Sequence, residues 1–193
     1  MQTFNNKFLS IYFFYLALGC IFYLILQIND FPYKYTFTDW LINYEGGFVR
    51  RGFLGQIIFE ISNLLNIQIQ HIILCFQITI YSIYFILFYL ILSKIKINYF
   101  WLLIIFSPIL FLYPLAELEA LGRKDIFVIS FFLIFSIINY KSLNGLAFSL
   151  IFFFSLSSLI HEITIFYLFH YLFVFYMKKK FFIYKKISKK YYL

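Results

Sequence analysis

The sequence predicts an all-α, polytopic membrane protein with about six transmembrane helices and a short interfacial amphipathic helix in the first extracytoplasmic loop. Hydrophobic residues make up 64% of the 193 residues, whereas soluble domains contain about 45–50%. A chain of this length cannot bury so much apolar surface in a core of its own. Charged residues make up only 12% and lie between long apolar runs. A helix is the structure in which each such run satisfies its backbone hydrogen bonds in lipid.

The predicted spans follow these apolar runs, at residues 8–28, 68–93, 97–116, 126–140, 145–160 and 163–177. About 20 residues cross the hydrocarbon core, so the first three runs are long enough and the last three are short. Residues 145–177 form either two short spans hinged at His161–Glu162, which we prefer, or one long tilted helix. We expect a single transmembrane domain over residues 1–177 and a basic tail over residues 178–193.

The distribution of charge predicts the orientation of these spans. With the N-terminus inside, six spans place eleven lysines on the cytoplasmic side and five cations outside, in agreement with the positive-inside rule. All eight acidic residues then lie outside. Both termini are therefore expected to be cytoplasmic. Because the net charge of +8 comes from short loops and the tail, we expect membrane lipid rather than nucleic acid as a partner.

The first outer loop, residues 29–67, carries two predicted helices. The pair Thr36 and Asp39 resembles a capping box, and it predicts a short helix over residues 39–45. A second helix follows Arg51, because apolar residues recur with a helical period opposite a polar stripe, which consists of Gln56, Glu60 and Asn63. It is too short to span a bilayer, so it lies on the membrane surface or packs into the bundle.

Three polar clusters fall at predicted span ends on the outer side, within residues 39–52, 117–125 and 161–162. If the bundle is compact, all three line one cavity. Arg50 and Arg51 lie among glycines, and the arginine fork suits a lipid-linked phosphate or pyrophosphate. The alternative is contact with lipid headgroups. Arg123 and Lys124 either bind the same phosphate or anchor the fourth span.

The carboxylates of the main loop are candidate general bases for glycosyl transfer, which requires a group to accept the proton of an acceptor hydroxyl. Asp39 or Glu45 can fill this role, although helix capping for Asp39 and ordinary solvation for Glu45 are the alternatives. His161 and Glu162 interrupt an apolar stretch, where ionisable residues are usually functional. We expect them to support the binding of the substrate, and the alternative is that they form the polar tip of a hairpin. The histidines show no zinc spacing, so we expect neither a metal nor another cofactor.

The segment NYEGGFVRRGFLG, residues 43–55, resembles part of bacterial multi-span proteins encoded in surface-polysaccharide gene clusters. In those proteins an F-x-R-R-G-L-like motif, an R-K-D or R-K-E motif and an H-E pair occur in this order. Phe48–Gly52, Arg123–Asp125 and His161–Glu162 match them here. The group resembles GT-C-type glycosyltransferases and O-antigen polymerases. Because its members usually have eight or more spans, this chain is expected to be a truncated or split version.

The resemblance implies a membrane glycosyltransferase or polymerase of the bacterial inner membrane. Its substrates would be polyprenyl-phosphate-linked sugars used in cell-envelope polysaccharide biosynthesis, with Asp39 or Glu45 as the base and the arginines on phosphate. Partner subunits of a polysaccharide assembly system are then expected. The alternatives are a transporter or flippase for lipid-linked oligosaccharide, and a non-catalytic membrane subunit or fragment.

Overall fold

Every regular element in the described part of the chain is a helix. The computed structural model describes residues 6–31, 34–49, 51–95, 97–107, 111–140 and 142–191. The elements in order are α1 (Asn6–Gln27), the short 3₁₀ helix η1 (Ile28–Asp30), α2 (Tyr35–Leu41), α3 (Gly52–Leu65), α4 (Ile69–Leu92), α5 (Tyr99–Ile105), α6 (Tyr113–Ala116), α7 (Asp125–Ile137), α8 (Leu143–Ile160) and α9 (Thr164–Tyr191). The prediction of an all-α fold is confirmed for these residues.

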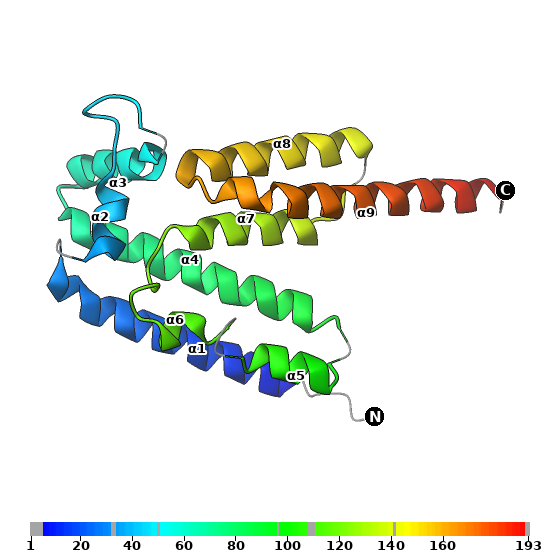
Figure 1. The fold of residues 1–193 in the computed structure, drawn as a ribbon, viewed down its shortest axis with the longest axis horizontal. Coiled ribbons are helices and arrows are strands. Elements are labelled where there is room, and N and C mark those ends of the chain that lie inside the picture. The colour runs from blue at the N-terminus through cyan, green and yellow to red at the C-terminus, as the bar shows by residue number, and fades with distance from the viewer. Residues whose placement is uncertain are drawn as a thin grey trace.

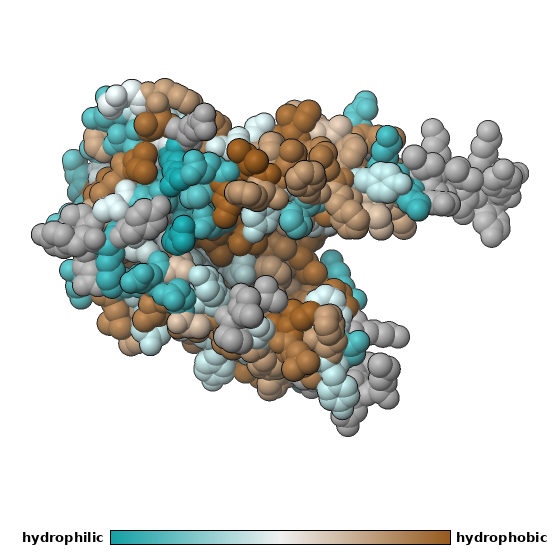
Figure 2. All heavy atoms as spheres, in the orientation of Figure 1, coloured by the Kyte–Doolittle hydropathy of each residue, from teal (hydrophilic) through white to brown (hydrophobic). Residues whose placement is uncertain are grey.

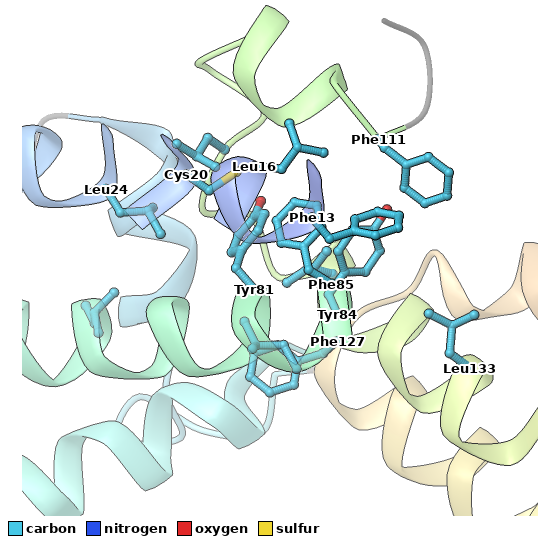
Figure 3. Packing of buried hydrophobic residues seen from close by; sticks show 14 of the residues in the cluster. Phe13, Leu16, Cys20, Leu24, Tyr81, Tyr84, Phe85, Phe111, Phe127 and Leu133 are labelled. Atoms are coloured by element: carbon cyan, nitrogen blue, oxygen red, sulfur yellow. The ribbon is translucent and has the colours of Figure 1, made fainter. Parts of the chain in front are cut away.

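The centre of the fold is the packing of α1 against α4 (Figure 3). Cys20 and Leu24 of α1 are fully buried, and Tyr81 and Phe85 of α4 are nearly so. Lipid tails are as apolar as these side chains, so close packing rather than transfer from water holds such helices together in a bilayer.

Three helices in the described part are long and apolar enough to cross a membrane, namely α1, α4 and α8. The span predicted over residues 97–116 does not form one helix, because α5 ends at Ile105 and α6 contains only four residues. Pro108 follows shortly after α5, and a proline disfavours helical backbone at the residue before it. With 13 residues, α7 is roughly 20 Å long. Six continuous spans are therefore not found in the described helices.

The segment between α1 and α4, predicted as the first outer loop, contains the two helices α2 and α3. The first was predicted over residues 39–45 but lies earlier, so Asp39 is inside α2, and the N-cap is Lys34. The second matches α3, whose Leu54 and Ile58 are buried while Leu64 at its end is 81% exposed. Since α3 contacts α2, α4 and α8, protein packing accounts for much of its apolar face. Its location on a membrane surface remains a prediction.

Residues 145–177 form two helices, as preferred from the sequence. The chain turns at residues 161–163, where His161 has extended backbone angles and ends α8, so α8 and α9 lie antiparallel (Figure 1). They pack on α7 around a core of their own, formed by Phe135, Leu146 and Tyr171. The predicted basic tail does not begin a new element, because α9 continues to Tyr191.

The two ends of the described chain lie at the same end of the bundle but on opposite sides of it (Figure 1). α1 begins and α9 ends at one end of the bundle, whereas α2, α3 and the α8–α9 turn lie at the other (Figure 1). The connections that carry the three predicted polar clusters are thus directed away from the two termini.

Candidate functional site

Polar side chains gather at the end of the bundle formed by α2, α3 and the α8–α9 turn (Figure 2). The rest of this face is mostly apolar. The gathered side chains come from three separate stretches of sequence, and the fold of each stretch fixes where its charged groups lie.

The α6–α7 connection enters the protein interior and is held there by its backbone. The buried Gly122 has φ +88°, its N–H donates to the Tyr81 hydroxyl at 3.0 Å, and its carbonyl accepts from Trp40 Nε1 at 2.7 Å and from Gln77 Nε2 at 3.0 Å. Non-helical backbone is tolerated inside a membrane protein only where such partners satisfy it. This connection therefore sets the position of the Arg123–Asp125 motif that follows it.

The α2–α3 connection is held just as closely to α3. A Cβ on Gly55 would lie 1.9 Å from the Ile42 carbonyl oxygen, and one on Gly52 would meet the Tyr44 ring at 2.4 Å. The Tyr44 amide also donates to Gln56 Oε1 at 3.0 Å. Only residues without side chains permit this approach. The connection thereby presents Arg51 at the start of α3, close to Asp39 on α2.

Arg51 joins all three stretches. Its Nη1 lies 3.8 Å from Asp39 Oδ1, and its Nη2 pairs with Glu162 Oε1 in the α8–α9 turn. Its carbonyl oxygen accepts a hydrogen bond from Lys124 Nζ at 3.1 Å. Arg51 therefore contacts residues of α2, of the α6–α7 connection and of the hairpin tip.

Lys124 is fully buried, and this determines what it can do. Burial lowers the pKa of Lys124 to about 8, Asp39 opposes this shift, and Arg51 adds to it. A ligand phosphate cannot reach a side chain with no exposed surface. In this arrangement Lys124 serves to hold the Arg51 backbone beside the Asp39 carboxylate.

Asp125 connects the hairpin tip to α7. Its Oδ1 lies 3.2 Å from His161 Nε2, and its Oδ2 lies 3.4 Å from Arg123 Nε. His161 Nδ1 accepts a hydrogen bond from the Ile163 amide, so a neutral His161 carries its proton on Nε2, facing Asp125. Burial lowers the pKa of His161, and Asp125 opposes this shift.

The structure brings together six charged or titratable residues predicted or noted from the sequence, together with Asp125. We call this set the charged cluster, and it consists of Asp39, Arg51, Arg123, Lys124, Asp125, His161 and Glu162. Glu45 lies instead on an exposed turn. Arg50 lies outside the described residues. The supporting side chains Trp40, Gln77 and Tyr81 were not predicted, although a glutamine within a long apolar run was an available signal.

A cavity of about 590 Å³ extends from the charged cluster along the bundle. Its lining is mostly apolar and comes from α4, α5, α6, α7 and the start of α9, and Arg123 and Asp125 are the two residues of the charged cluster that line it. Figure 2 shows the molecule hollowed between the α5 side and the α9 side. An apolar cavity with a few polar groups is the usual form of a binding site.

Comparison of the chain with protein-family models, with curated proteins and with solved structures finds no match.

Proposed function

We propose that this chain is an inner-membrane protein that binds a polyprenyl-phosphate-linked sugar and transfers the sugar in cell-envelope polysaccharide assembly. The observation that carries this proposal is the charged cluster at one end of a mostly apolar cavity. A phosphate joined to an isoprenoid chain has this same division, with an anionic head on a long apolar tail. Arginine is well suited to the head, because its fork binds phosphate oxygens in pairs.

In this proposal the chain crosses the membrane six times, with both termini in the cytoplasm and the charged cluster outside. Figure 1 supports this topology, because the start of α1 and the end of α9 lie at the same end of the bundle. The interrupted segment from α5 to α6 lies against α1, where Tyr12 donates a hydrogen bond to the Ile105 carbonyl at 2.8 Å. A broken span whose backbone is satisfied by protein is compatible with lipid.

The roles proposed for the two arginines follow their exposure. The side chains of Arg51 and Arg123 are 27% and 41% exposed, so these two would contact the phosphate. Asp39 would accept the proton of the acceptor hydroxyl as its oxygen attacks the sugar. The bond from the sugar to the phosphate oxygen would break, and the lipid phosphate would leave with the electron pair. Glu45 remains a second candidate base.

The test is substitution of Arg51 by Ala, with Lys179→Ala in the middle of α9 as the matched loss of an exposed cation. We expect Arg51→Ala to abolish surface polysaccharide at normal protein level, because the phosphate loses its fork, and Lys179→Ala to leave it intact. Arg51→Lys tests the geometry separately from the charge. Normal polysaccharide in Arg51→Ala cells with normal protein level would contradict the proposal.

A transporter or flippase is the second candidate, because the cavity and the cluster serve binding equally well without a bond being broken. The double substitution Asp39→Asn with Glu45→Gln separates the two. A transferase loses product without its base, whereas transport of labelled lipid-linked sugar in vesicles survives.

A further inference from the structure

The charged cluster is balanced in the unliganded protein. Its cations are Arg51, Arg123 and Lys124, and its carboxylates are Asp39, Asp125 and Glu162. His161 is not a further cation at neutral pH, because burial lowers its pKa. A phosphate that enters the cluster therefore adds negative charge to a neutral set. Binding is favoured if one of the carboxylates moves away from its partner.

Exposure identifies which carboxylate can move. The side chain of Asp39 is 3% exposed and that of Asp125 is 25% exposed, whereas that of Glu162 is 51% exposed. Breaking a buried pair leaves a charge without solvent, which is strongly unfavourable. Breaking an exposed pair returns both groups to water at small cost. Glu162 is thus the partner that Arg51 can release most easily.

Glu162 is the exposed residue of a turn whose neighbouring residues His161 and Thr164 are buried. Ile160, the last residue of α8, is buried in the core around α1 and α4, and a second small core of Phe135, Leu146 and Tyr171 lies farther along the hairpin. At its far end Lys178 Nζ donates hydrogen bonds to the Phe135 and Ile138 carbonyls at 3.1 Å and 2.7 Å. Ile163 and Tyr167, just beyond the turn, line the cavity. Release of Glu162 would therefore loosen a wall of the cavity where the charged cluster begins.

We propose that Glu162 is an intramolecular competitor of the substrate: it pairs with Arg51 in the resting protein, and an arriving phosphate displaces its side chain and loosens the turn at residues 161–163. The identity of the competing ligand rests on the function proposed above. The ion pair between Arg51 and Glu162 does not depend on that function. It assigns Glu162 a regulatory role in place of direct contact with the substrate.

The experiment measures phosphate binding and hairpin mobility in the full chain in nanodiscs. Glu162→Gln is compared with wild type and with Glu119→Gln, which makes the same charge change on an exposed residue of the α6–α7 connection. The probes are farnesyl phosphate and inorganic phosphate. Amide hydrogen exchange of residues 157–167 reports whether the turn between α8 and α9 becomes more mobile. Glu162→Asp, with a shorter side chain, is the second variant if Glu162→Gln is poorly produced.

We expect Glu162→Gln to lower the dissociation constant for farnesyl phosphate about two- to five-fold, as loss of an exposed ion pair with Arg51 would do. Glu119→Gln should leave it unchanged. Exchange in residues 157–167 should be faster in unliganded Glu162→Gln than in wild type, and wild type should approach it when phosphate is added. Tighter binding of farnesyl phosphate than of inorganic phosphate would identify the lipid-linked form as the source.

Weaker binding by Glu162→Gln would overturn the inference, because it would mean that Glu162 helps to hold the ligand. Unchanged exchange in Glu162→Gln would overturn it as well. If no variant binds either phosphate, the proposed function fails by itself. Amide exchange in unliganded Glu162→Gln then still tests the contact between Arg51 and Glu162. Exchange faster than in wild type supports the contact, and exchange equal to wild type rejects it.

Discussion

Gly122 is the residue at which the fold and the candidate site depend most directly on one atom. Its φ of +88° favours glycine, and a Cβ there would meet Gln77 Nε2 at 2.8 Å and Leu24 Cδ2 at 3.3 Å. Both backbone groups of Gly122 are used by neighbouring side chains. Replacing Gly122 by Ala therefore forces a strained backbone and displaces the glutamine that holds the α6–α7 connection.

The magnitude can be worked out from two contributions. A side chain at positive φ costs about 1–2 kcal/mol, and overpacking of a buried site costs about 1–3 kcal/mol. We therefore expect Gly122→Ala to lower the free energy of unfolding by about 2–5 kcal/mol. The chain offers matched controls, because a Cβ on Gly46 or on Gly47 would meet nothing within 4 Å. Of these two glycines, only Gly47 has a positive φ, +115°.

The assay is thermal unfolding of purified protein in detergent micelles, with one denaturation curve for each glycine variant. Gly46→Ala should match wild type, Gly47→Ala should lose about 1–2 kcal/mol from backbone strain alone, and Gly122→Ala should lose most. If Gly122→Ala unfolds at the wild-type temperature while Gly47→Ala does not, the close packing around the connection is wrong.

Two further predictions concern the opposite ends of the hairpin. Because burial lowers the pKa of His161, the unfolded chain takes up a proton first as pH falls below about 6.5. The unfolding temperature should therefore fall as the pH is lowered from 7.5 to 5.5. This fall should be less steep in His161→Gln than in the exposed control His71→Gln, and an equal fall in both variants would exclude His161 as the cause. Lys178→Met should lose about 1–3 kcal/mol, since hydrogen bonds from a charged donor to the last carbonyls of α7 disappear, and Lys179→Met should lose none by the same unfolding measurement.

The features that could be predicted from the sequence are those with a local signal. The period of apolar residues after Arg51 predicted α3 closely, and the pair His161–Glu162 marked the turn between α8 and α9. The meeting of three clusters could also be predicted, because each lies at the end of an apolar run on the same side. Local patterns and the alternation of spans were sufficient for these features.

The missed features depend on tertiary contacts that leave no periodic pattern. The break between α5 and α6 was signalled only by Pro108 and Pro114, in a run otherwise apolar enough to span. α2 begins earlier than predicted, at Tyr35, so Asp39 lies inside the helix, where it pairs with Arg51 and does not cap an end. The burial of Lys124 has no sequence signal, since a lysine beside Arg123 and Asp125 resembles an exposed loop residue.

The burial of Lys124 separates the fixed part of the charged cluster from the movable part. With its pKa lowered to about 8, Lys124 disfavours its charged form by about 3 kcal/mol relative to an exposed lysine. A buried charge needs hydrogen-bond partners, and here Lys124 donates to the Arg51 carbonyl and fixes the Arg51 backbone beside Asp39. Loss of Lys124 should therefore appear first as instability. The side chain of Glu162 is exposed and does not hold buried backbone in place. Its loss should therefore appear as a change in binding while the fold persists.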